Sequence, residues 1–202
     1  MKKFCSLLCG VLLALSLGAC AQGDTKTMYL EAAQLSAEEQ DIATLLGADT
    51  QQRIYDFTLD DTVNHMQINT YELVDGAWQL LSGGGGMQFT DPQGRLALGF
   101  EHIADGLRVA VQSEHNSGAT AYYKEQQSDL TGMNTATSTL SERVPIVWDQ
   151  EIPLTIQTVT SQDASRSFSV DSFFTPEEFA PYNYEHVYAI TTLFSQAPVA
   201  NE

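Results

Sequence analysis

The chain has 202 residues, with 26 Asp and Glu against 9 Lys and Arg, a formal net charge of −17, and 43% hydrophobic residues. A chain this acidic repels nucleic acid, acidic polysaccharide and anionic lipid head groups, which excludes polyanion binding as its function. The charges are scattered in ones and twos through an apolar-rich sequence, which argues against a disordered acidic tail and predicts a folded domain.

An export signal stands at the start of the sequence. Lys2 and Lys3 form a positive segment, and an apolar stretch over residues 4–17 leads into two small residues. This pattern is typical of a secretory signal peptide, and the stretch is too short for a spanning helix, which needs about 20 apolar residues. We therefore expect residues 1–19 to direct export and to be removed.

The tetrapeptide Leu17-Gly18-Ala19-Cys20 resembles the lipobox of bacterial lipoproteins. The resemblance implies that Cys20 is linked to diacylglycerol and anchors the mature chain to the membrane on its extracytoplasmic side. The acidic chain also resembles the surface lipoproteins of Gram-positive gut anaerobes, which implies a compartment and no mechanism. An alternative is open, because Ala19-Cys20-Ala21 fits the A-x-A site of ordinary signal peptidase, and cleavage after Ala21 would release a soluble, secreted protein.

The cysteines are all near the N-terminus, at Cys5, Cys9 and Cys20. Under the lipobox interpretation the first two leave with the signal and the third carries lipid, so the mature domain has no free thiol. Disulfides, a thiolate nucleophile and cysteine metal sites are then excluded. Loss of Lys2 and Lys3 leaves 7 Lys and Arg against 26 Asp and Glu, a net charge of −19.

Two elements are expected before the strands begin. Residues 20–34 are predicted to form a lipidated tether. The sequence Ser36-Ala37-Glu38-Glu39 is a capping box of the S-x-x-E type, and apolar residues follow it at helical spacing until Gly47. We expect one short helix here, packing its apolar stripe over one end of a sheet. The stripe consists of Ile42, Leu45 and Leu46.

From Gln51 onward the pattern has a period of two, with turn residues about every ten positions. Further strands are predicted at residues 54–59, 63–74, 86–90, 119–124, 136–144, 152–159 and 167–173. In the second of these the apolar set shifts phase, which predicts a bulge near Asn69 or Thr70. The last strand, His186 to Ser195, is apolar on both alternations, so we expect it to be central and covered on both faces.

Two hairpins follow from register. With Asp75-Gly76 as a two-residue type I′ turn, Leu73 falls opposite Trp78 and Tyr71 opposite Leu80, so apolar side chains share a face.

The same turn at Asp105-Gly106 would pair Phe100 with Val111 and His102 with Val109. Leu96 and Leu98 are expected on the same face as these pairs.

The predicted fold is an all-β, antiparallel β-sandwich with one short N-terminal helix, of which a jelly roll is one form, and a closed β-barrel is the alternative. Residues 35–196 are expected to form a single domain, because the central strand comes last and the core needs it. Residues 197–202 are expected to form a flexible tail.

No pattern identifies a catalytic, cofactor or metal site. The run Gly83 to Gly86 lacks the Lys-Ser or Lys-Thr of a phosphate loop, and predicts a flexible connection or a bulged strand end. None of the four histidines, His65, His102, His115 and His186, has the H-x-H or H-x-x-x-H spacing of a metal-binding pair. The sequence also lacks the G-x-S-x-G motif of serine hydrolases and the H-E-x-x-H motif of metalloproteases. Asp60-Asp61 lies at a predicted turn and could contribute to a calcium site. The alternative is a plain Asx turn without a metal.

Aromatic residues are the remaining lead. Tyr122 and Tyr123 are consecutive, so one of them faces away from the core, and Tyr182 and Tyr184 follow Pro181 in a loop before the last strand. Flat rings at sandwich edges suit sugar faces, and tyrosine is favoured at protein interfaces. These four tyrosines are the candidate contacts with a protein or glycan partner. For the segment from Thr175 to Tyr184, the favoured alternative is that it covers a sheet edge.

The leading hypothesis is a non-catalytic, membrane-anchored extracytoplasmic lipoprotein that binds a ligand or partner, with no cofactor and no nucleic acid. One alternative is a surface glycan hydrolase using two carboxylates, which sequence spacing does not test. Another is a structural subunit of an envelope assembly.

Overall fold

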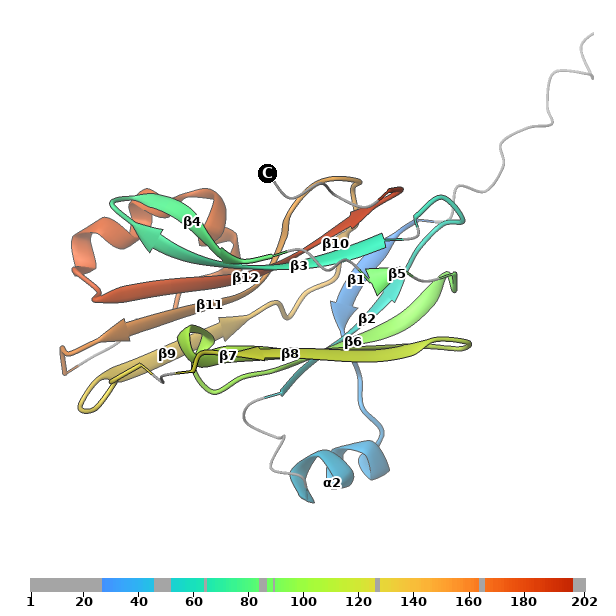
Figure 1. The fold of residues 1–202 in the computed structure, drawn as a ribbon, viewed down its shortest axis with the longest axis horizontal. Helices are drawn as coiled ribbons and strands as arrows, with labels where there is room; N and C mark the ends of the chain where they lie inside the picture. Colours follow the sequence, from blue (N-terminus) through green and yellow to red (C-terminus); the bar gives the residue numbers. More distant parts are fainter. Residues whose placement is uncertain are drawn as a thin grey trace, which may run out of the picture.

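The computed structural model describes residues 27–45, 52–63, 65–83, 87–88, 90–125, 128–163 and 166–197. The predicted signal peptide, the lipobox and Cys20 lie outside these residues, as does most of the Gly83 to Gly86 run. Two antiparallel sheets face each other (Figure 1). The all-β sandwich is confirmed, and the closed barrel is wrong because no strand pairing between the described residues joins the two sheets.

The first sheet has six strands. In spatial order they are β10 (Val144–Pro145), β1 (Tyr29–Ala32), β2 (Gln52–Thr58), β6 (Gln93–Gly99), β7 (Gly106–Ser113) and β8 (Ser117–Tyr123).

The second sheet places the last strand of the chain at its centre. Its order is β4 (Ala77–Ser82), β3 (His65–Val74), β12 (His186–Ser195), β11 (Ile152–Thr160) and β9 (Asn134–Thr139), with the short β5 (Met87–Gln88) beside β3. The central position expected of His186 to Ser195 is confirmed, with the same bounds.

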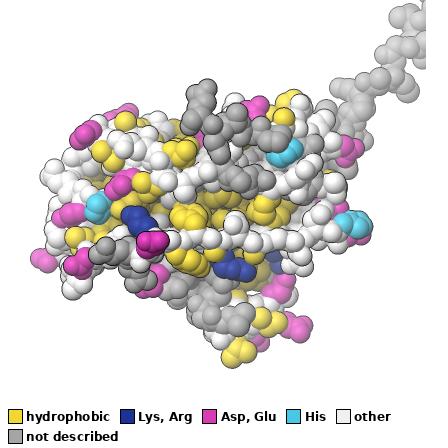
Figure 2. Space-filling view, viewed as in Figure 1, with side chains coloured by type: hydrophobic (Ala, Val, Ile, Leu, Met, Phe, Trp, Pro, Cys, Tyr) yellow, Lys and Arg dark blue, Asp and Glu magenta, His cyan; other side chains and the backbone are white. Residues whose placement is uncertain are grey.

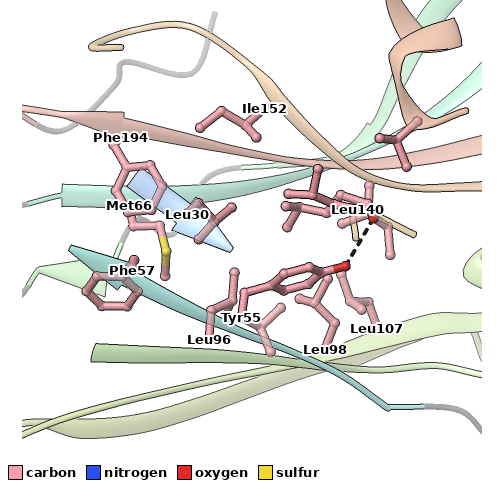
Figure 3. Close-up of a cluster of buried hydrophobic side chains, with 14 of the residues drawn as sticks. Leu30, Tyr55, Phe57, Met66, Leu96, Leu98, Leu107, Leu140, Ile152 and Phe194 are labelled. Carbon is pink, nitrogen blue, oxygen red and sulfur yellow. Dashed lines mark hydrogen bonds between the residues drawn. The ribbon is translucent and has the colours of Figure 1, made fainter. Parts of the chain in front are cut away.

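The main core lies between the sheets. Leu30, Tyr55 and Phe57 of the first sheet meet Met66 and Phe194 of the second, each 1% exposed or less. Figure 3 shows these side chains pointing toward one another, with the buried Tyr55 hydroxyl donating to the Leu154 carbonyl at 3.1 Å. Burial of this many large apolar side chains is the main stabilising contribution to the fold.

A second cluster covers the outer face of the second sheet. The segment containing η2 (Val170–Phe174) and η3 (Pro176–Tyr182) packs there (Figure 1). Phe179 joins Ile156, Val187 and Ala189, and Trp78 Nε1 donates to the Phe173 carbonyl at 2.8 Å. The prediction of a strand at residues 167–173 is therefore wrong, because these aromatic side chains are buried against a sheet face instead of being paired in it.

The first hairpin is confirmed residue by residue. Leu73 pairs with Trp78 and Tyr71 with Leu80, and the turn residues Asp75 and Gly76 have φ of 52° and 78°. Two positive φ values are what a type I′ turn requires, so the local sequence is sufficient to define it.

The predicted irregularity near Thr70 is present, since the β3–β4 register shifts between Thr70 and Tyr71. The apolar phase changes because Met66 packs in the main core, whereas Tyr71 and Leu73 pack in the cluster on the opposite face.

The register expected for the second hairpin is wrong by four residues. Val111 pairs with Leu96 and Val109 with Leu98, and a 3-10 turn, η1 (Ile103–Asp105), lies within the connection. The shared face of these four residues is nevertheless confirmed.

The connection of that hairpin is held by a buried side chain of the other sheet. The Ile103 N–H donates to Gln157 Oε1 at 2.9 Å, and Gln157 Nε2 donates to the Glu101 carbonyl at 3.1 Å. Hydrogen bonds from Gln157, a residue more than 50 positions away, therefore determine the conformation of the connection between β6 and β7. The turn propensity of Asp105-Gly106 does not determine it.

The N-terminal elements differ from expectation in two ways. Tyr29–Ala32, assigned to the tether, forms strand β1 between β2 and β10, with Leu30 fully buried. The helix α2 (Ala37–Leu45) begins with the predicted capping box, because the Ser36 N–H donates to Glu39 Oε2 at 2.8 Å and the Glu39 N–H to Ser36 Oγ at 3.3 Å. However, α2 buries none of its residues and stands off the outer face of the first sheet (Figure 1).

Candidate functional site

The two sheets leave an apolar cleft between them on one side of the sandwich. The cleft has a volume of about 430 Å³, and the space-filling view shows hydrophobic side chains exposed in a band between the sheets (Figure 2). Its apolar lining comes from β3, β5, β7 and β8. The main contributors are Met66, Ile68, Met87, Leu107, Val109 and Tyr122.

Strand β8 forms one rim of the cleft and is the edge strand of the first sheet. Gly118, Thr120 and Tyr122 face the cleft, since they lie opposite Val111, Val109 and Leu107 of β7. All seven residues of β8 are exposed, and none of them is charged or a proline. Natural edge strands are usually protected by charge, proline or covering segments, so this edge is unusually open to pairing.

The backbone of β8 offers free hydrogen-bonding groups along that edge. The Lys124 N–H donates to the Asp105 carbonyl at 2.9 Å, and the Asn116 carbonyl accepts from the Ser113 N–H at 2.7 Å. Even-numbered residues therefore bond toward β7. By the alternation of an antiparallel ladder, residues 117, 119, 121 and 123 point their N–H and C=O groups away from the sheet.

Tyr122 joins the two rims. Its hydroxyl lies 2.7 Å from Oγ1 of Thr70, a residue of β3 that is 1% exposed. Tyr123, the next residue, points to the opposite side of β8 and is 68% exposed. The sequence prediction that the two tyrosines face opposite sides is therefore confirmed, and Tyr122 is the one at the cleft.

The other two predicted contact residues lie elsewhere, beside the segment that covers the second sheet. The rings of Tyr182 and Tyr184 stack on each other at 5.8 Å, and both meet Phe168 edge-on. Arg166 lies across the Tyr182 ring and donates to its hydroxyl. Part of each ring surface is therefore covered by partners within the chain, and the pair lies apart from the cleft.

A groove on the outer face of the first sheet collects acidic side chains. It has a volume of about 650 Å³ and is lined in part by Glu31, Glu39, Asp56, Asp91 and Glu114.

Most of these carboxylates are held by cationic or hydroxyl partners. Arg95 donates to Glu39 at 2.7 Å and to Asp56 at 2.8 Å, and Arg143 donates to Glu31 at 2.8 and 2.9 Å. Hydrogen bonds from Ser36 and Arg95 lower the pKa of Glu39 to about 2, and Arg143 lowers the pKa of Glu31. A glycosidase acid needs a raised pKa, so Glu31 and Glu39 do not supply one.

Asp60, a candidate calcium ligand, already accepts hydrogen bonds within its own turn. Asp60 Oδ1 accepts from the Thr62 N–H at 2.9 Å and also from the Thr62 hydroxyl, which is an Asx turn. Across the described ranges no three His, Cys, Asp or Glu side chains gather closely enough to hold a metal ion. In the same ranges every helix is too short or too polar for a transmembrane segment.

Sequence reasoning missed most of the cleft lining. Met66, Ile68 and Met87 gave no signal beyond strand alternation, because their proximity to β8 depends on the order of strands. One signal was available in the uncharged run Ser117 to Tyr123, which is long for an exposed strand in so acidic a chain. Comparison of the chain with protein-family models, with curated proteins and with solved structures finds no match.

Proposed function

We propose that the chain is a membrane-anchored extracytoplasmic binding module that captures a partner protein by adding an extended segment of that partner to strand β8. The observation that carries the proposal is the open edge of β8, uncharged, free of proline and exposed over seven residues beside an apolar cleft. The lipobox at Leu17 to Cys20 supports the location, with Cys20 as the lipid attachment site.

Strand addition divides the task between backbone and side chains. The outward N–H and C=O groups of β8 supply affinity without regard to sequence, and pockets for alternate side chains supply selectivity. Every second residue of the guest strand would point into the cleft, beside Met87, Val109 and Tyr122. The remaining guest residues would face the surface of a chain with a net charge of −17. The favoured guest is therefore a segment that alternates apolar and basic residues.

The proposal is tested with a displayed library of eight-residue peptides and the chain carrying Cys20→Ser to prevent lipidation. Ala121→Pro removes one outward N–H without removing a bond to β7, and proline is tolerated on such an edge. Ala121→Val is the matched control, since it keeps the N–H and suits a strand.

We expect enrichment of peptides that alternate apolar and basic residues, with binding at least about tenfold weaker to the proline variant and retained by the valine variant. An unenriched library, or equal binding by both variants with unchanged thermal stability, would refute the proposal.

The structural-subunit alternative has one supporting observation. Leu80 and Leu81 of the edge strand β4 are large apolar residues that are 54% and 44% exposed. An assembly subunit would self-associate or co-purify in fixed stoichiometry, whereas a capture module is monomeric until the peptide is added. Sedimentation of the Cys20→Ser chain separates the two.

A further inference from the structure

A second apolar groove lies on the outer face of the first sheet, beneath helix α2. Its volume is about 650 Å³. Its floor is a row of four residues in register across β2, β6, β7 and β8, because Ile54 pairs with Ala97, Ala97 with Ala110 and Ala110 with Ala119. Three alanines in a row leave depth above the sheet that larger side chains would fill.

Helix α2 forms a wall of this groove without filling it. Ile42 and Ala43 line the groove together with Leu35, yet Ile42 is 52% exposed. A 2.7 Å ion pair between Glu39 and Arg95 ties α2 to the sheet. Amphipathic helices on β-sheets normally bury their apolar stripe, so the separation of α2 from the alanine row leaves room for an apolar guest.

The groove contains a free cation. Arg95 is neutralised by Glu39 and Asp56, and Arg143 by Glu31. Arg108 also lines the groove, and in the described part of the chain it has neither an ion-pair nor a hydrogen-bond partner. An unpaired guanidinium is notable in a chain with 26 acidic residues, and guanidinium groups recognise carboxylates and phosphates through paired hydrogen bonds.

We propose that this groove binds a long acyl chain with a single anionic head group, the chain lying on the Ile54–Ala97–Ala110–Ala119 row beneath α2 and the head group on Arg108. A largely apolar site with one unpaired charge, the exposed Arg108, selects an amphiphile over a sugar or a peptide. The volume falls within the range of about 300 to 1,000 Å³ that small-molecule sites occupy. A free fatty acid and a single membrane phospholipid share this chemistry. The net negative charge of the chain repels polyanions and anionic surfaces, whereas the unpaired Arg108 attracts one head group at contact distance.

The test is a fluorescence titration of the Cys20→Ser chain with 11-(dansylamino)undecanoic acid, followed by competition with palmitate and with methyl palmitate. Arg108→Gln removes the cation, and Arg143→Gln is the matched control because its charge lies outside the groove lining. Ala110→Phe fills the middle of the floor, and its thermal stability is measured beside its binding.

We expect saturable binding that palmitate displaces, that weakens about tenfold in Arg108→Gln, that is unchanged in Arg143→Gln and that is lost in a folded Ala110→Phe. Methyl palmitate has no carboxylate, so it should displace the probe equally well from Arg108→Gln and from the parent chain. Competition with phosphatidylglycerol vesicles identifies the source of the bound lipid. If vesicles displace the probe, the ligand is a membrane lipid, and if only palmitate does, the ligand is a free fatty acid. The groove binds an acyl chain in both cases.

Absence of saturable binding overturns the inference, and so does binding that Arg108→Gln and Ala110→Phe leave unchanged. The result is distinguishable from strand addition, because Arg108→Gln and Ala110→Phe change side chains on the outer face of the first sheet and leave the outward N–H and C=O groups of β8 in place.

Discussion

Tyr122 and Thr70 connect the two sheets across the mouth of the cleft, with 2.7 Å between the Tyr122 hydroxyl and Thr70 Oγ1. Tyr122 lies on the edge strand of the first sheet, and Thr70 is buried in the second. This polar contact spans the cleft, so its removal should perturb the spacing of the two sheets there.

Tyr122→Phe should lower the free energy of unfolding by about 1 kcal/mol, since it leaves the buried Thr70 hydroxyl without its partner. Thr70→Val should cost a similar amount, and the double variant should cost less than the sum. Urea unfolding of the three variants measures the coupling. Strictly additive losses would show that the bond contributes nothing to joining the sheets.

Two glycines of β6 should respond differently to the same substitution. A Cβ on Gly94 would lie 2.4 Å from Cζ of the buried Phe57 and 2.8 Å from the Gln112 carbonyl oxygen. Gly94→Ala should therefore destabilise the protein by about 1 to 3 kcal/mol through overpacking. Gly99→Ala is the control, because its Cβ would meet Arg108 Cβ at 3.8 Å, an ordinary contact, and should change stability by less than about 0.5 kcal/mol. Thermal denaturation compares them, and equal melting temperatures would contradict the predicted clash.

Strand β1 should be essential to the core, although the sequence predicts a tether there. Leu30 is fully buried between the sheets. Leu30→Ala should cost about 2 to 5 kcal/mol, because it removes apolar contact and leaves a cavity. Glu38→Ala on exposed α2 should cost less than about 0.5 kcal/mol. Urea midpoints of the two variants give the comparison, and a small effect at Leu30 would mean that β1 is not part of the stable fold.

Asp91 and His115 should make the β7–β8 turn sensitive to pH. Asp91 accepts from the Ser113 hydroxyl at 2.6 Å, from the His115 N–H at 2.8 Å and from the His115 ring at 2.7 Å. The hydrogen bonds from Ser113 and His115 hold the pKa of Asp91 well below its usual value, and Asp91 raises the pKa of His115.

Both pKa shifts stabilise the fold, but the two contributions depend on pH in opposite directions. The lowered pKa of Asp91 stabilises the fold above about pH 4, and this stabilisation is lost as pH falls through the folded-state pKa. The raised pKa of His115 stabilises the fold below about pH 6.5, and this stabilisation is lost as pH rises through its folded-state pKa. The turn should therefore be most stable between about pH 4 and 6.5.

An NMR titration of the His115 ring checks this relationship. The pKa of His115 should lie above about 6.5 in the parent chain and should fall toward that value in Asp91→Asn. Ser113→Ala, which removes a different partner of Asp91, serves as the control. A His115 pKa that Asp91→Asn leaves unchanged would show that the ion pair does not form in solution.

Local sequence was sufficient where the interaction that decides a conformation lies within a few residues. The Asp75-Gly76 turn sets its own register because both residues adopt positive φ, and Ser36 and Glu39 close the capping box with each other. Prediction failed where a distant residue decides. Gln157 holds the 101–103 connection and shifts the second hairpin by four residues, and Phe173 and Phe179 are buried by a sheet face instead of forming a strand.

The amino-acid sequence by itself determined the all-β architecture, the two-residue turn, the helix start and the central last strand, because alternation, φ preference and capping are local properties. The tertiary structure alone decided that β8 is an unprotected edge, that Tyr122 and not Tyr182 or Tyr184 lines the cleft, and that α2 stands above an alanine row with a free Arg108. These features depend on which strands become neighbours, and the free energy of that choice is spread over contacts between residues far apart in the chain.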